Sequence, residues 1–371
     1  MENIDNWLEY LDDAASDKEL FDAASAIIAI PKKPGPDFWD SSFILHVPLE
    51  LCARYFLLPL VEDDFVAGAR RQIRMMARKY FEYENAENVS NDNLEVDFNI
   101  AGVDVDQWST SLLFASHGPI LLAMQNALGE TNDSIHIVLT RMADTIAAGG
   151  DVRMDWTRTA GTKQDIAPDL LQHPQDWFIE SVGNIDHVDG PTDSIRVGIE
   201  TVERSGQIEP LVETIASIAN FSDRADFELP FQCLIRTATL SMVIESEEHS
   251  KYGWTHCLTI PHGIWSLMSF SVSRSRMLQA ATTHVATFRA LMAESKMSAD
   301  QLEEYFEVEE DSVFAEHYVR IQDIISQASV LEDAHLVKYV YTCFDCMKRD
   351  PQYSKLYIAA AGKLLELWKS E

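Results

Sequence analysis

Apolar residues that recur every three or four positions are the feature of this sequence that most restricts its fold. That spacing places them on one face of an α-helix, whereas a half-buried strand needs alternating polar and apolar residues, which are scarce here. The sequence therefore predicts an all-α fold. Three groups show the spacing most clearly: Leu49, Ala53, Phe56 and Leu57; Leu211, Ile215, Ile218 and Ala219; and Phe314, Tyr318, Ile321, Ile324 and Ile325.

Two local signals mark helix boundaries toward the C-terminus. Ser298 is followed three residues later by Gln301, which is the spacing of a capping box at a helix N-terminus. Asp350 precedes Pro351, and a residue before proline avoids helical backbone angles. We therefore expect one helix to begin after Ser298 and another to end before Pro351.

Length and apolar content favour one large domain. The chain has 371 residues, 46% of them hydrophobic, which is enough to bury one large core or two closely fused cores. We expect a single large helical domain over residues 1–371, with two lobes as an alternative. Residues 149–193 are rich in glycine and proline and should be the least regular part. They are interpreted either as a lid over a pocket or as a long connection anchored by buried tryptophans.

The chain is strongly acidic, with 29 Lys and Arg residues against 60 Asp and Glu residues and a formal net charge of −31. Such a charge disfavours phosphate backbones and anionic lipid surfaces, so neither a nucleic acid nor a membrane is an expected partner. The N-terminal residues lack the basic start and apolar run of a secretory signal, and no apolar run approaches the roughly 18 residues of a membrane helix. We expect a cytoplasmic protein, and its five cysteines do not indicate a disulfide framework.

Four histidines stand out by their sequence context. His46 and His117 each stand two residues before a proline, and each opens an apolar helical run. Because proline suits the first position of a helix, both imidazoles are expected near helix N-termini. His256 and His262 form a further cluster before another apolar run. A lone histidine in such a context is usually a capping or core residue, but several in similar contexts favour one shared site.

His335 and Lys338 are the most informative pair. They are three residues apart, so on a helix they share one face, and that face is otherwise apolar. A lysine buried on such a face has a lowered pKa, which makes its amine available as a base, a nucleophile or a site for carbon dioxide addition. The alternative is a lysine whose ammonium reaches solvent from the helix edge.

Several short motifs, taken in order along the chain, resemble the questin-oxidase-like family, whose fungal and bacterial enzymes act on polyketide-derived aromatic compounds. The resemblance covers most of the chain loosely. The motifs are His46-x-Pro48, residues 231–237 (FQCLIRT), His256-x-x-Thr259, residues 333–338 (DAHLVK) and residues 357–361 (YIAAA).

The resemblance implies a helical fold around a non-haem iron that lies between helices. Its imidazole ligands would be His46, His117, His256 and His335, and the carbamate of Lys338 would add an oxygen ligand. Such a donor set suits divalent iron, and an open coordination position would admit dioxygen or substrate. The implied function is a metal-dependent oxygenase that uses dioxygen and a planar aromatic or polyketide-like small molecule.

The chain departs from the family pattern at Gln232, where the family often has histidine, and glutamine is a much poorer iron ligand. One explanation is that Gln232, and with it Arg236, supports the ligands from outside the coordination sphere. Another is that His117 or His262 fills the role, which makes His262 a reserve ligand. The third is that the site has been lost.

Two rival functions remain, of which the resemblance implies the first, and Gln232 with the absence of a self-sufficient catalytic motif favours the second. One is a Baeyer–Villiger-type monooxygenase that draws on separate NADPH, and the other is a non-enzymatic helical scaffold without metal. No G-x-G-x-x-G or G-x-x-x-x-G-K-[ST] pattern is present, so no built-in nucleotide or flavin site is expected. Cys343-x-x-Cys346 lacks the second cysteine pair that a zinc site would need and lies within a predicted helix.

Overall fold

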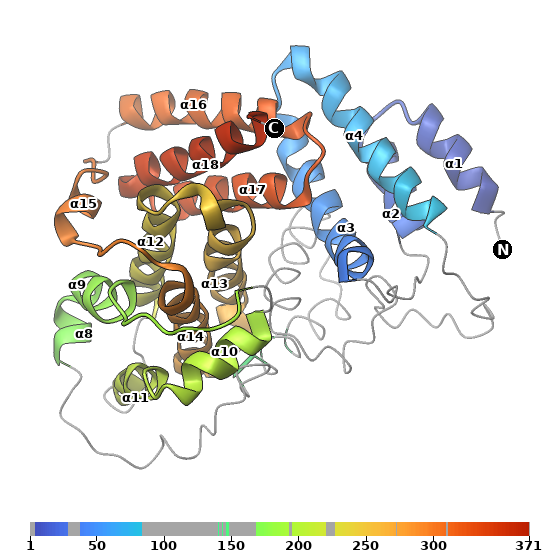
Figure 1. The fold of residues 1–371 in the computed structure, drawn as a ribbon. Helices are drawn as coiled ribbons and strands as arrows, with labels where there is room; N and C mark the ends of the chain where they lie inside the picture. The colour runs from blue at the N-terminus through green and yellow to red at the C-terminus, as the bar shows by residue number, and fades with distance from the viewer. Residues whose placement is uncertain are drawn as a thin grey trace. The chain divides into compact units, whose positions relative to one another are not determined.

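The computed structural model describes residues 4–28, 38–83, 168–192, 195–219, 227–271, 273–308 and 311–370, together with positions 140, 143, 146 and 147. Every regular element within these residues is a helix, and none of them is a strand (Figure 1). The predicted all-α fold is therefore confirmed. None of the described helices has an apolar stretch long enough to cross a lipid bilayer.

The chain divides into two compact units, of which the first comprises Met1–Trp108 and Tyr318–Tyr341. Within it, α2 packs against α1, α3 and α4 (Figure 1). Its described elements are α1 (Ile4–Asp13), α2 (Asp17–Ile28), α3 (Phe38–Leu57), the 3-10 helix η1 (Leu58–Leu60), α4 (Asp63–Glu82), the C-terminal part of α16 (Asp311–Ser329) and the N-terminal part of α17 (Ala334–Arg349).

The second unit comprises Ser109–His317 and Thr342–Glu371. Its described α-helices, besides the remaining parts of α16 and α17, are α8 (Pro168–Gln172), α9 (Pro174–Trp177), α10 (Ile195–Arg204), α11 (Ile208–Ala219), α12 (Glu228–Ile244), α13 (Thr255–Leu267), α14 (Arg274–Met292), α15 (Ala299–Glu303) and α18 (Ser354–Lys369). Short turns of other helix types are η6 (Phe178–Gly183), η7 (Glu247–His249), η8 (Ser250–Trp254), η9 (Met268–Phe270) and η10 (Pro351–Tyr353).

Helix α14 forms the centre of the second unit. It packs against α10, α11, α12 and α13, and every residue from Met277 to Met292 is buried. A helix buried all round must satisfy its polar side chains internally. Gln279 does so by donating to the Val212 carbonyl oxygen at 2.6 Å, and the Thr283 hydroxyl donates to the Gln279 carbonyl oxygen at 2.9 Å.

In the first unit, arginines of α4 cap the C-terminus of α1. Arg74 donates to the carbonyl oxygens of Leu11 and Ala14, each at 3.1 Å, and Arg70 donates to the Ala14 carbonyl oxygen at 2.9 Å. The last carbonyls of a helix lack partners within the helix and carry partial negative charge. The two guanidinium groups therefore fix α1 on α4.

The boundary signals are confirmed by the structure. Ser298 and Gln301 form a capping box at the start of α15, and α17 ends at Arg349, directly before Asp350 and Pro351.

One other local prediction is wrong. Pro48 does not begin a helix, because it lies inside α3, and His46 therefore lies well within that helix and not at its N-terminus. The segment predicted to be irregular is so in part, because residues 168–183 form α8, α9 and η6, residues 184–192 form no helix, and residues 149–167 lie outside the described residues.

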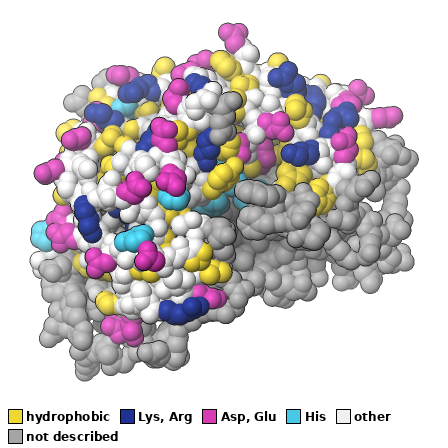
Figure 2. All heavy atoms as spheres, viewed as in Figure 1, with side chains coloured by type: hydrophobic (Ala, Val, Ile, Leu, Met, Phe, Trp, Pro, Cys, Tyr) yellow, Lys and Arg dark blue, Asp and Glu magenta, His cyan; other side chains and the backbone are white. Residues whose placement is uncertain are grey.

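The charged side chains are distributed over the surface as the composition predicts for a solvated exterior. On the face drawn in Figure 2, acidic side chains are interspersed with lysines and arginines. Pairs such as Lys18 with Asp22 at 2.6 Å and Arg204 with Glu200 at 3.3 Å lie at the surface, where water screens their attraction, so they contribute little to stability.

Gly68 marks a close approach between α4 and the turn that joins α16 to α17. A Cβ atom at position 68 would lie 2.7 Å from the Val330 Cγ1 atom. Gly68→Ala should therefore cost about 1–3 kcal/mol through overpacking, against a gain of about 1 kcal/mol in helix propensity. In a Val330→Ala background the clash is absent, so the same substitution should become stabilising. Urea unfolding of the four proteins checks this reversal of sign, and an equal effect in both backgrounds would contradict the close approach.

Candidate metal site

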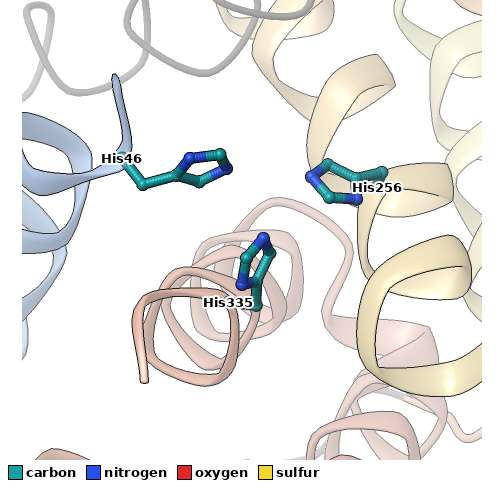
Figure 3. A group of neighbouring side chains, drawn as sticks. All are labelled: His46, His256 and His335. Atoms are coloured by element: carbon teal, nitrogen blue, oxygen red, sulfur yellow. The ribbon is translucent and has the colours of Figure 1, made fainter. Parts of the chain in front are cut away.

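His46 and His335 face each other within the first unit, one from α3 and the other from the first turn of α17 (Figure 3). Their ring centroids are 4.8 Å apart, and one ring nitrogen of each lies within 4.8 Å of the other. Both side chains are partly buried. Two distant parts of the sequence, 289 positions apart, thus bring a pair of imidazoles together.

This separation fits a shared metal ion. Metal-to-imidazole bonds are about 2.0–2.1 Å long, so two nitrogens on one ion are at most about 4.2 Å apart. The His46 and His335 nitrogens lie within 4.8 Å of each other, so a movement of roughly half an ångström suffices to bring the pair within this limit.

Asp333 fixes the start of α17 and with it the place of His335. Its Oδ1 atom accepts hydrogen bonds from the backbone N–H groups of His335 at 2.7 Å and Leu336 at 2.9 Å. These are N-terminal N–H groups that have no partner within the helix. Lys338 follows His335 by three residues, so the two share the helix face that the sequence predicted.

The Asp333 carboxylate also bears on which nitrogen of His335 is available. Its Oδ1 atom lies 3.7 Å from the His335 Nδ1 atom, which is near but beyond hydrogen-bond distance. A carboxylate on that side favours a proton on Nδ1 and leaves the Nε2 lone pair for a ligand, as is usual around metal-binding histidines. The sequence motif contained Asp333, but its role as helix cap and histidine partner was missed.

Burial lowers the pKa of Lys338 to about 8, and the nearby Asp333 and Glu50 carboxylates only partly offset this effect. The residue keeps some exposed surface, but protein atoms surround its amine. The lowered pKa that the apolar helix face predicted is confirmed. At pH 7 about a tenth of the amine is then neutral, against less than about one part in a thousand for an ordinary lysine.

Because the pKa of Lys338 is lowered on folding, the stability of the metal-free protein should depend on pH. The folded state has a pKa of about 8, below the value of about 10.4 in the unfolded chain, so protonation opposes folding below pH 8 and this penalty is lost as the pH rises toward 10.4. Lys338→Met should be more stable than the wild type at pH 7, and the difference should shrink between pH 8 and 10. Urea unfolding at each pH measures this, with the exposed Lys355→Met as control. A difference that does not change with pH would contradict the lowered pKa.

His256 is the third histidine in Figure 3, and α13 of the second unit carries it. Its Nδ1 atom is hydrogen-bonded to the Tyr252 carbonyl oxygen one turn earlier. A carbonyl oxygen only accepts, so Nδ1 is the donor of this hydrogen bond and carries the proton. Tyr252 supports His256 as Asp333 supports His335, and no sequence motif marked it.

His262, the reserve ligand, contacts an acidic side chain of α17. It is buried, and its Nε2 atom pairs with the Asp345 Oδ2 atom at 2.9 Å. Burial of Asp345 opposes its ionisation, but the His262 hydrogen bond and charge hold the pKa of Asp345 below its usual value. Pro261 lies inside α13 and does not begin a helix. His262 therefore joins α13 to α17 through this contact, and its assignment as reserve ligand stays a prediction.

Gln232 and Arg236, the candidates for supporting the ligands, contact the C-terminal end of α17. Arg236 makes two hydrogen bonds of 2.7 Å to the Asp350 carboxylate, and Gln232 donates to the Arg349 carbonyl oxygen at 3.3 Å. The Tyr357 hydroxyl also donates to Asp350 at 2.8 Å. In the described contacts these residues hold helices of the second unit together and do not touch a histidine. His117, the remaining predicted ligand, lies outside the described residues.

No protein-family model matches the chain, and no curated protein or solved structure matches it either.

Proposed function

We propose that the chain is a metal-dependent oxidoreductase in which His46, His335 and His256 bind one divalent iron ion. The observation that carries the proposal is the pair of His46 and His335, which face each other with nitrogens close enough to share an ion. His256 is included as a ligand because the resemblance to the questin-oxidase-like family implies it, and its Nδ1 atom is engaged by a backbone carbonyl.

Lys338 extends this donor set. Its amine, neutral in about a tenth of the molecules at pH 7, can attack carbon dioxide, forming an N–C bond and releasing one proton to leave a carbamate. The carbamate would add the anionic oxygen that a set of neutral imidazoles lacks, and this combination suits iron. Its place as a ligand follows the resemblance to the questin-oxidase-like family.

The class of reaction also follows that resemblance. Non-haem iron, when bound, supplies the activation of dioxygen that an oxygenase needs. The residues of this chain would fix the ring orientation of the ligands, through Asp333 and Tyr252, and keep the proton on each Nδ1 atom. The substrate class is a planar aromatic or polyketide-like small molecule.

Metal loading and oxygen uptake test the proposal together. The full-length protein is loaded with Fe(II) without oxygen, desalted and analysed for iron, and oxygen consumption is then measured with planar polyketide-type phenols, with and without NADPH. We expect one iron per chain and uptake that does not need NADPH. Uptake that requires NADPH would favour the Baeyer–Villiger alternative. A chain that retains none of Fe(II), Co(II) and Zn(II) would overturn the proposal in favour of a helical scaffold.

A further inference from the structure

Arg54 links the helix that carries His46 to the turn before the helix that carries His335. It lies on α3, two turns after His46, and only 3% of it is exposed. Its NH1 and NH2 atoms donate to the carbonyl oxygens of Ser329 at 2.9 Å and Leu331 at 2.8 Å. Its Nε atom donates to Glu50 at 2.8 Å, which holds the guanidinium plane in place.

The same turn is held from α4. Gln72 donates to the Val330 carbonyl oxygen at 2.8 Å, so three successive carbonyls, 329 to 331, are bound by side chains of the first unit. Asp333 then caps α17, and His335 is in the first turn of that helix. Only three residues, 332 to 334, lie between the last bound carbonyl and the candidate ligand, and their backbone has little freedom to absorb a shift.

Stability alone is a weak reason for such an arrangement. A buried Arg–Glu pair is often no more stabilising than apolar side chains of the same volume, because both charges lose their water. The guanidinium group instead fixes where the bound carbonyl oxygens lie, because its N–H donors have a rigid planar geometry. His46, Glu50 and Arg54 recur every four residues, so they lie along one side of α3. One side of α3 thus carries the candidate ligand His46 and, through Arg54, also binds the turn that precedes the helix of the other candidate ligand, His335.

We propose that Arg54, oriented by Glu50, is the positioning residue that sets the separation between the His46 and His335 nitrogens. This role rests on the proposed metal site. Metal-to-ligand distances tolerate only about 0.2 Å, so a small displacement of the 329–331 turn weakens binding. Groups that orient metal ligands typically change metal affinity by about 10- to 100-fold when they are replaced.

Arg74 provides a matched control. It also uses its guanidinium to bind two carbonyls at a helix C-terminus, those of Leu11 and Ala14, but the helix it caps carries no candidate ligand. Arg54→Lys and Arg74→Lys keep the charge and lose the fork. We expect both to lower the unfolding temperature of the metal-free protein. Only Arg54→Lys should weaken Co(II) binding, by about 10- to 100-fold, and alter the Co(II) visible spectrum.

The outcomes separate this role from the metal site itself. If the wild type binds Co(II) and Arg54→Lys matches its affinity and spectrum, the positioning role is wrong and the metal site stands. If the wild type binds none of Co(II), Fe(II) and Zn(II), both are wrong. Should Arg54→Lys fail to fold, Gln72→Leu serves as the second variant, because it removes the bond to Val330 and is a milder change. Wild-type affinity and spectrum in Gln72→Leu would then overturn the proposal.

Discussion

Replacing His335 with alanine is expected to abolish stoichiometric metal binding, and replacing His46 should do the same. Each imidazole offers one ring nitrogen to the proposed ion, and the two lie close enough to share it. Loss of a group that only orients a ligand costs about 10- to 100-fold in affinity, so loss of a ligand should cost more than about 100-fold. Titration of the full-length protein with Co(II) measures this, and circular dichroism checks that the helices are retained.

Two other histidines are controls for this prediction. His187→Ala removes an exposed imidazole near Asp189, and His262→Gln removes the partner of Asp345. The first should leave both stability and metal affinity unchanged. The second should lower stability but leave one ion per chain. Metal loss in His262→Gln with binding retained in His335→Ala would reverse the assignment and restore His262 as the ligand.

The helices were predictable because their signals are local. The apolar residues of α3, α11 and α16 recur at helical spacing in the sequence. The start of α15 and the end of α17 are marked by residues close in sequence, Ser298 with Gln301 and Asp350 with Pro351. Such signals need no knowledge of the rest of the chain.

The helix start predicted at Pro48 was wrong because the burial of apolar side chains outweighs the cost of a proline inside the helix. A proline inside a helix costs about 3 kcal/mol, which is why Pro48 was predicted to begin a helix. Pro261 is a second proline that the structure places inside a helix. Both lie inside helices with buried apolar neighbours on either side, such as Val47 and Leu49 around Pro48. Full burial of one such side chain contributes about 1.5–3 kcal/mol, so a few of them offset the proline. The tertiary contacts that decide this balance are not visible in a short segment.

The candidate site was predictable in part for the same reason. The three-residue spacing of His335 and Lys338 predicted that they share one helix face, and the apolar residues on that face predicted the lowered pKa of Lys338. The role of His262 depends on Asp345, which is 83 positions away, and no local pattern connects them. The hydrogen bonds from Arg54 to the carbonyl oxygens of Ser329 and Leu331 likewise join residues far apart in the sequence.

Replacing Arg289 with methionine is expected to destabilise the second unit by about 3–5 kcal/mol. Arg289 and Glu245 are each only 1% exposed, and the NH1 atom of Arg289 pairs with the Glu245 carboxylate. Arg289 also donates to the carbonyl oxygens of Gly183 at 2.8 Å and Ser295 at 2.7 Å. Methionine would leave a buried carboxylate and two carbonyls without their main donor, which is the costly way to break a buried pair.

Urea unfolding followed by the fluorescence of the buried Trp254, whose ring centre lies 5.7 Å from the Arg289 guanidinium carbon, reports on this loss. Arg276→Met, at an exposed position on the same helix, is the control and should change stability by less than about 0.5 kcal/mol. Adding Glu245→Gln to Arg289→Met removes the uncompensated charge while keeping an acceptor for the backbone N–H groups of residues 294 and 295. The double variant should therefore recover part of the loss. If it were less stable than Arg289→Met alone, the cost would arise from lost packing and not from the buried charge.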